Sequence, residues 1–238
     1  MISYTLTRTK RKTIAIYITY NGVEVRAPHV TPKYEIDRFV ASKEKWIEEK
    51  ASIMRERMEN RDSFRLDYGS LVLFRGMTYP IAESKDAIGF DGACFRVPPG
   101  LDFEEIKRAC IDIYRMQAKR VIEPRTSAFA EQMAVNYASV KITGAQKQWG
   151  SCTAKKRINF SWRLMMADDA LIDYVIVHEL AHTLELNHSA DFWDIVGAFL
   201  PDFRERKKRL DELHERIANE DWKINKIIGD SAKNKSSA

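Results

Sequence analysis

The sequence predicts an α+β fold with a β-rich N-terminal part and a second part built of helices and a small sheet. Residues 13–18 and 23–26 alternate apolar and polar side chains around Asn21-Gly22, which is the strongest short-range signal of a β-hairpin. Beyond residue 101, apolar residues recur mainly at the spacing of helices. With 45% hydrophobic and 31% charged residues, the chain has the composition of a globular protein.

After the hairpin, the sequence predicts one long helix and three short strands. Apolar side chains at helical spacing run from Thr31-Pro32, a helix start with Thr as N-cap, to about residue 58, and residues 59–63 read as a break. Strands follow at 71–74, 78–82 and 94–97. Pro98-Pro99-Gly100 then marks a boundary. We therefore predict that residues 1–100 form the β-rich N-terminal part.

The second part is predicted to span residues 101–228. Asp102 and Glu105 have the spacing of a capping box, and the helix they begin is expected to end or kink at Pro124, with a further helical piece to about residue 135. Strands are expected at 140–143, 147–152 and 157–162. Three more helices are expected, from Asp168 or Asp169 to about 186, from Ser189 to before Pro201, and from Asp202 to about 218. The small polar segment 229–238 is predicted to be a flexible tail.

Composition limits the function classes. The net charge of +5 permits an anionic partner without requiring one. No apolar run approaches the roughly 20 residues that span a bilayer, so no membrane association is expected. The N-terminus has no secretory pattern, which favours the cytoplasm. Cys94, Cys110 and Cys152 lack paired spacing and are expected to be reduced thiols. No feature of the sequence distinguishes a monomer from an oligomer.

The most informative motif is His178-Glu179-Leu180-Ala181-His182. On a helix, residues four apart lie about 40° apart around the axis, so both imidazoles project side by side and can hold two corners of a tetrahedral zinc site. Glu179 is rotated by about 100° and can reach a water on the metal without being a ligand. This is the H-E-x-x-H arrangement of zincin-type hydrolases.

A catalytic zinc needs a third protein ligand and an open position. His188 lies six residues after His182, and Asn187 can end the helix in a left-handed turn that brings His188 to the metal. The alternative third ligands are Glu185, Asp191 and Asp194. His29 and His214 are expected to be solvated surface residues.

Other residues are weaker candidates. Trp149, Gly150 and Ser151 either form an edge strand that contacts substrate or a bulge with Trp149 in the core. Arg163 either stabilises a developing oxyanion or forms an ion pair with Asp168 or Asp173. Cys152 is expected to be a packed thiol rather than a nucleophile.

Several motifs together resemble the YgjP-like family of metal-dependent hydrolases, which is related to SprT-like and other H-E-x-x-H zincins. They are Val25-Arg26-Ala27-Pro28, Lys45-Trp46-Ile47, residues 148–152, residues 158–164, residues 173–182, Asn187-His188-Ser189 and Phe192-Trp193. The resemblance covers nearly the whole chain. It implies a zincin-like core, with His178, His182 and His188 as metal ligands and Glu179 as the catalytic carboxylate.

Two connecting segments depart from the family pattern. Residues 153–156 lack the Gly often found there, and Asp168-Asp169 stands where the family often has Pro before the active-site helix. These departures leave the ligand set intact and affect the shape of the loops around the substrate. The family is usually identified with peptidases, and a nucleotide pyrophosphohydrolase activity has also been associated with it.

We therefore predict a zinc metallopeptidase that uses a metal-activated water on a peptide or protein substrate. Nickel, cobalt and copper also suit histidine ligands. One alternative is a metal-dependent nucleoside-triphosphate pyrophosphohydrolase, with Arg8, the basic run at 10–12, Lys147 and Arg163 holding phosphates. A second alternative, of another class, is a nucleic-acid-associated module with a zinc site, although the sequence has no recognised nucleic-acid motif.

Overall fold

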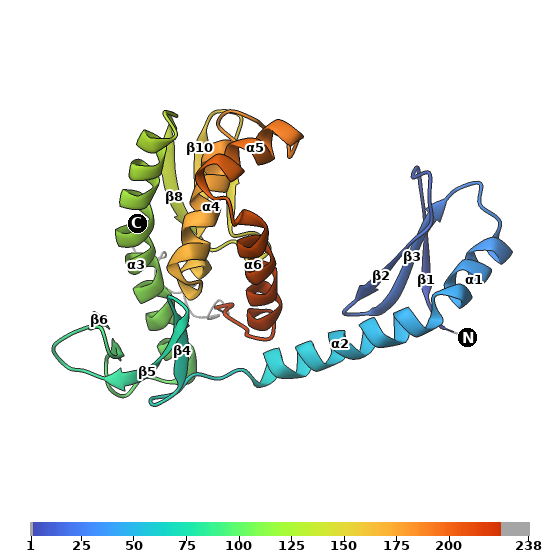
Figure 1. Cartoon of the computed structure of the whole chain (residues 1–238). Helices are drawn as coiled ribbons and strands as arrows, with labels where there is room; N and C mark the ends of the chain where they lie inside the picture. The colour runs from blue at the N-terminus through green and yellow to red at the C-terminus, as the bar shows by residue number, and fades with distance from the viewer. Residues whose placement is uncertain (1, 225–238) are drawn as a thin grey trace, which may run out of the picture. The chain divides into compact units, whose positions relative to one another are not determined.

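The computed structural model describes residues 2–224 and confirms a mixed α+β chain. The described residues form three small sheets and six α-helices, and they divide into two compact units (Figure 1). Of the described residues, the first unit holds 2–64 and 218–221, and the second holds 65–217 and 222–224. The predicted tail, 229–238, lies outside the described residues. Within 2–224, no helix has the length and apolar character needed to cross a bilayer.

The first unit is a three-stranded sheet with two helices. Its strands have the order β1-β3-β2, and β2 pairs antiparallel with β3 through the turn at Asn21-Gly22, as predicted. The predicted single helix is two helices, because the backbone at Lys43 leaves helical geometry with φ −109° and ψ 11°. The elements are β1 (Thr5–Thr9), β2 (Ala15–Thr19), β3 (Gly22–Pro28), α1 (Lys33–Ser42) and α2 (Glu44–Ser63). No side chain caps α1, so the predicted Thr31 cap is wrong.

The second unit begins with a four-stranded sheet of order β4-β5-β7-β6. Its strands are β4 (Leu71–Phe74), β5 (Met77–Glu83), β6 (Gly89–Phe90) and β7 (Phe95–Val97). The rings of Phe74 and Phe95 pack on Tyr114 of the following helix, at centroid distances of 6.2 and 5.1 Å. The compact units therefore separate at residue 64, whereas the domain boundary expected near residue 100 stays a prediction.

A single long helix, α3 (Phe103–Gln132), follows this sheet. Asp102 and Glu105 form the predicted capping box. The helix does not end at Pro124, one of the two predicted outcomes, because it continues through Pro124 to Gln132. The hydroxyl of Thr126 donates to the carbonyl of Ile122 at 2.7 Å within this stretch. The helix thus offers one long surface to the rest of the unit.

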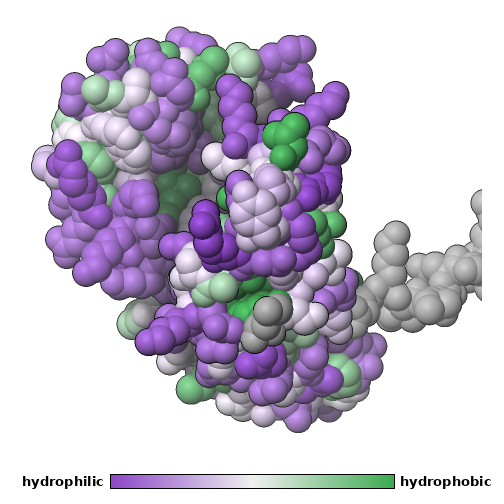
Figure 2. Space-filling view, turned by 90° about the vertical axis from the view of Figure 1, so that its right-hand side faces the viewer, coloured by the Kyte–Doolittle hydropathy of each residue, from purple (hydrophilic) through white to green (hydrophobic). Residues whose placement is uncertain are grey.

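The remaining elements build the other half of the second unit. They are β8 (Ser139–Thr143), β9 (Gly150–Cys152), β10 (Arg157–Ser161), α4 (Asp169–Ala181), α5 (Ala190–Phe199) and α6 (Phe203–Ile217). The sheet has the order β8-β10-β9, so β9 is an edge strand. Helix α4 lies centrally, in contact with α3, α5, α6 and β9 (Figure 1). Hydrophilic side chains dominate the face of the molecule in Figure 2, and hydrophobic ones occur there in small groups.

Candidate metal centre

Helix α4 is a buried core helix with a defined start. Asp168 is its N-cap, and its carboxylate accepts a hydrogen bond from the backbone N–H of Leu171 at 3.1 Å. Nearly every later side chain of the helix is buried, which fits a sequence that is apolar around its whole circumference. The helix ends at Ala181 rather than near residue 186, and His182 is its C-cap. The motif therefore lies at the end of the helix, where the chain turns.

Three imidazoles converge after this turn. One nitrogen from each of His178, His182 and His188 lies within 4.8 Å of the other two, and the Nε2 atoms of His178 and His188 are 3.1 Å apart. Asn187 acts differently from the prediction, because it has no positive φ angle. Its side-chain oxygen instead accepts from the N–H of Ser189 at 3.1 Å, which is an Asx turn. This turn precedes α5 and helps to position His188.

The surroundings of the three rings fit a metal ion. The Nδ1 of His182 lies 2.9 Å from the carbonyl oxygen of Glu185. A carbonyl only accepts, so Nδ1 carries the proton and Nε2 keeps a lone pair for a metal. Burial, with smaller contributions from the two other imidazoles, lowers the pKa of His178 to about 3, so this ring stays neutral and able to ligate. Three neutral imidazoles are a donor set typical of zinc.

An apolar wall backs the three histidines. The ring of Phe192 is fully buried and lies 4.5 to 4.9 Å, between centroids, from each imidazole. Trp193 stacks on His188 at 5.6 Å. Both aromatic residues come from the first turn of α5, which begins at Ser189 as the sequence predicts. The wall restricts the rotation of the rings and keeps their nitrogens directed toward one another.

The side chain of Glu179 packs directly against Gly150 of the edge strand β9. The side chain of Glu179 is 5% exposed, and its Oε2 has no hydrogen-bond partner among the described residues. A Cβ atom at Gly150 would lie 2.6 Å from both Cγ and Oε1 of Glu179, so only glycine fits there. Burial raises the pKa of Glu179 to about 8. The sequence pattern indicated a close approach at Gly150, and the structure shows that the approaching group is this carboxylate.

The strand that carries Gly150 has a free edge. The N–H of Ser161 donates to the carbonyl of Trp149 at 2.8 Å, and the N–H of Thr153 donates to that of Arg157 at 3.0 Å. Hydrogen-bonded pairs alternate along an antiparallel ladder. The backbone groups of Gly150 and Cys152 must therefore point away from β10, at the edge where no other described strand pairs.

The other candidates are distributed around this centre. Trp149 is half-buried, and its ring contacts the partly exposed His214 of α6 at a centroid distance of 5.9 Å. No local pattern could have indicated this contact, because the two residues are far apart in the sequence. The hydroxyl of Ser151 accepts from Asn159 at 3.2 Å. Burial, and then the charge of Glu179, raises the pKa of the Cys152 thiol, which argues against a thiolate nucleophile.

Arg163 and the rival ligands lie outside the cluster. Arg163 is buried against the Trp162 ring, 5.5 Å from its centroid, and lines a cavity of about 400 Å³ that contains none of the three histidines. The two carboxylates that were expected to pair with Arg163 pair with other arginines: Asp168 with Arg209, and Asp173 with Arg125. Among the described residues, the cluster of possible ligands contains none of Glu185, Asp191 and Asp194.

Comparisons with known proteins place the chain in a metallopeptidase family. A family model described as "YgjP-like, metallopeptidase domain" matches residues 12–213. The zymogen of abylysin, a metallopeptidase of Pyrococcus abyssi, is 19% identical over 39% of this chain and 94% of its own, with a TM-score of 0.37. The zymogen of jannalysin, a metallopeptidase of Methanocaldococcus jannaschii, is 18% identical over 39% of this chain and 95% of its own, with a TM-score of 0.36. No curated protein sequence matches the chain.

Proposed function

The chain belongs to the YgjP-like family of metallopeptidase domains, and we propose that it is a zinc-dependent peptidase with a zincin-like core. One observation carries the proposal. Nitrogens of three imidazoles lie within 4.8 Å of one another at the end of a buried helix, and the residue after the first of these histidines, Glu179, has a buried carboxylate. His178, His182 and His188 are the proposed ligands, and Glu179 is the proposed catalytic residue. A metal-dependent hydrolase needs both groups side by side.

The ligand set suits an ion with an open coordination position. His178, His182 and His188, from one helix end and one turn, would hold the metal with three ligands, and a catalytic ion of this kind keeps its fourth position for water or substrate. When bound, the ion supplies Lewis acidity for the attacking water and for the scissile carbonyl. Zinc is the natural occupant of a site made of imidazoles alone, although nickel, cobalt and copper also accept such ligands.

Glu179 handles the proton in this proposal. Burial raises the pKa of Glu179 to about 8, so its ionised form is a stronger base than an exposed carboxylate. In that form its Oε2, which has no hydrogen-bond partner among the described residues, can accept the proton of the attacking water and return it to the leaving amine. The close contact with Gly150 limits how far the carboxyl group can swing. A general base must keep its position to within a fraction of an ångström, and this contact provides that restraint.

The free edge of β9 provides a place for an extended peptide. The backbone N–H and C=O groups of Gly150 and Cys152 are directed to that edge, beside Glu179. A peptide that adds to an edge strand gains main-chain hydrogen bonds regardless of its sequence. Trp149 and Ser151, the other substrate-binding candidates, would then contact the side chains of the peptide.

The nucleotide alternative has less support from the geometry. Arg163 was expected to hold phosphates near the metal, and it lines the separate cavity beside Trp162. Arg8 donates to the carbonyls of Pro28 and Thr31 at 2.7 and 2.6 Å, which gives it a role in the first unit. The main-chain groups on the edge of β9 match a peptide better than a triphosphate.

The test combines metal content with hydrolysis. Elemental analysis of the full chain is expected to find about one zinc per wild-type molecule and to show its loss in His188→Ala. Glu179→Gln should keep the metal and lose about 10²- to 10⁴-fold in the rate of cleavage of a quenched fluorescent peptide library. Glu185→Gln is the matched control, because the same chemical change on the following turn leaves the Glu185 carbonyl in place for His182.

Each outcome decides between the readings. About one zinc per molecule in His188→Ala would mean that another residue is the third ligand. Full peptidase activity in Glu179→Gln would overturn the role of that carboxylate. Metal-dependent release of pyrophosphate from nucleoside triphosphates, without peptide cleavage, would establish the nucleotide alternative.

A further inference from the structure

The sheet of the first unit has one face that its helices cover and one that they do not. The covered face is apolar, with Val25 and Ala27 fully buried against Ile36, Val40 and Ile47 of the two helices. Side chains alternate along each strand, so the neighbours of these residues point to the opposite face. Among the described residues, the two helices of this unit pack on the first face only, and we call the second face the open face. It consists of Thr5, Thr7, Ala15, Tyr17, Glu24 and Arg26.

The pairing register places the residues of the open face in two rows. Thr5, Glu24 and Tyr17 are aligned across the three strands in one row, and Thr7, Arg26 and Ala15 are aligned in the next. Tyr17, the single aromatic ring among these residues, therefore lies directly across from Glu24 and diagonally across from Arg26. The guanidinium of Arg26 lies over the Tyr17 ring, 4.5 Å from its centroid, and Tyr17 is 39% exposed. The guanidinium and the ring therefore form a cation–π pair on the open face.

Positive charge gathers at one end of the open face. The loop between β1 and β2 contains Lys10, Arg11 and Lys12, and Arg11 donates to the Tyr17 hydroxyl at 3.2 Å. The one acidic residue of the face, Glu24, already accepts from Arg26 at 2.8 Å and from Thr7 at 3.1 Å. These interactions occupy its carboxylate, which reduces its repulsion of an incoming anion.

The charge of the chain is unevenly distributed. Residues 1–28 hold five lysines and arginines and one glutamate, whereas residues 65–217 hold 22 basic and 22 acidic residues. An excess of positive charge on one small sheet is the electrostatic footprint of a polyanion-binding surface. Tyr20 adds a second exposed ring, 78% exposed, at the turn that ends β2.

We propose that the open face binds single-stranded nucleic acid. The basic loop contacts phosphates, and Tyr17 with the guanidinium on it provides a platform on which a base stacks. A duplex keeps its bases in its own stack and cannot use this platform, so a single strand is the partner that the geometry favours. RNA and single-stranded DNA share the phosphates and bases on which this proposal depends. It does not depend on the peptidase proposal, because none of its residues belongs to the metal centre.

The test measures fluorescence anisotropy of labelled U12 and dT12 oligonucleotides with the full chain over a range of salt concentrations. We expect a dissociation constant on the order of micromolar at low salt that rises steeply with salt. Changing Lys10, Arg11 and Lys12 to Gln should lower the slope of log Kd against log salt by about 2, since each phosphate contact contributes about 0.7. Tyr17→Leu should weaken binding about tenfold, and Tyr17→Phe should restore it.

A control variant separates this surface from charge in general. Arg38, Lys45 and Lys50 are exposed on α1 and α2, and changing all three to Gln alters the net charge by the same amount as the loop variant. Equal weakening by the two triple variants would overturn the proposal, as would the absence of any anisotropy change at low salt. Tighter binding of duplex DNA would overturn the stacking platform. Displacement by poly-glutamate, with the same dependence on Tyr17, would make an acidic protein the partner instead.

Unchanged oligonucleotide binding by Glu179→Gln is also expected. This result separates the two proposals, because the failure of one leaves the other standing. A preference for U12 over dT12 would identify RNA as the source of the ligand. Equal binding would mean that the open face recognises only what the two nucleic acids share.

Discussion

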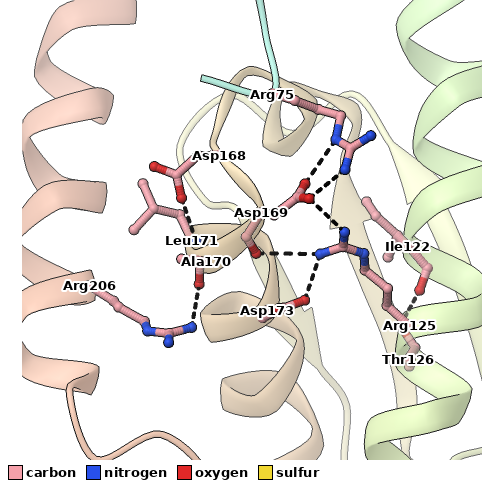
Figure 3. Close-up of polar contacts among 10 residues, drawn as sticks. All are labelled: Arg75, Ile122, Arg125, Thr126, Asp168, Asp169, Ala170, Leu171, Asp173 and Arg206. Atoms are coloured by element: carbon pink, nitrogen blue, oxygen red, sulfur yellow. Dashed lines mark hydrogen bonds and ion pairs between the residues drawn. The ribbon is translucent and has the colours of Figure 1, made fainter. Parts of the chain in front are cut away.

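The two ends of α4 differ in how their charged groups are partnered. At its start each carboxylate meets an arginine. Asp169 pairs with Arg75 and Arg125, and Asp173 pairs with Arg125 (Figure 3). Asp168 pairs with Arg209. At its end, the Nδ1 of His178 and the Oε2 of Glu179 are buried with no hydrogen-bond partner among the described residues. Buried polar groups without partners cost stability, so a fold keeps them where they serve chemistry. The paired end holds the helix in place, and the unpaired end is where the reaction is expected.

The largest expected effect is that of bound zinc on the free energy of unfolding. If the three imidazoles at the unpaired end of α4 bind an ion, free zinc at about 1,000 times its dissociation constant should raise the free energy of unfolding by about 4 kcal/mol. Chelation should remove this gain, and His188→Ala should abolish it. Denaturant unfolding of the wild type and the variant, with and without zinc, measures the difference. A zinc effect of equal size in His188→Ala would place the ion elsewhere.

The contact between Gly150 and Glu179 predicts the next largest effect. In Gly150→Ala the new methyl group would lie 2.6 Å from Glu179 atoms, so the carboxyl group must move. A displacement near 1 Å costs roughly 100-fold in rate, and overpacking costs about 1–3 kcal/mol of stability. Gly144→Ala is the control, because a Cβ there has its nearest neighbours at 3.8 Å. Equal activity of the two variants would mean that the Glu179 position is not critical.

Sequence patterns predicted the starts of α4 and α5, where the information is local, but placed the end of α4 about five residues too late. The Asp168 cap, the Ser189 cap and the histidine spacing depend on residues only a few positions apart, and the structure has both caps. The close approach at Gly150 was indicated as well, but its partner was not, since Glu179 comes from another element. The ion pair of Arg75 with Asp169 spans 94 positions, and no local pattern indicates it.

The errors in the helices have physical causes of the same kind. Residues 59–63 continue α2 because its polar residues allow a helix, although they show no apolar period. Pro124 does not interrupt α3, whose packing outweighs the loss of one backbone hydrogen bond. Tertiary contacts override local preference in both directions, and a single sequence does not display those contacts.

The paired end of α4 should respond in stability rather than in chemistry. Arg125→Gln removes the partner of Asp173 and one partner of Asp169, in a site where the arginine is 28% exposed. We expect a loss of about 1–2 kcal/mol in the free energy of unfolding, with unchanged zinc content. Arg115→Gln, on the same helix, should cost almost nothing, because Arg115 is 51% exposed and lies 3.6 Å from Asp112. Loss of zinc in Arg125→Gln would show that the two ends are coupled.

The smallest expected effect is a difference in the pH dependence of Asp169 and Asp173, the two carboxylates that pair with Arg125. Hydrogen bonds from Arg75, and then from Arg125, lower the pKa of Asp169, whereas burial raises the pKa of Asp173 despite its pair with Arg125. The ionised Asp169 therefore adds stability above its unfolded pKa of about 4, and this stability is lost as the pH falls through the lower folded value. For Asp173 the sign is opposite: its contribution is largest below about pH 4 and declines as the pH rises through the higher folded value.

Unfolding experiments between about pH 3 and 7 on Asp169→Asn and Asp173→Asn can detect these opposite slopes. The cost of Asp169→Asn should grow with pH, and the cost of Asp173→Asn should shrink. Each change should stay below about 1 kcal/mol, because the Asp169 side chain is 45% exposed and that of Asp173 is 27% exposed. Slopes of the same sign would mean that Arg125 governs both carboxylates and that burial does not distinguish them. Opposite slopes would show that pairing with arginine dominates the pKa of Asp169, whereas burial dominates the pKa of Asp173.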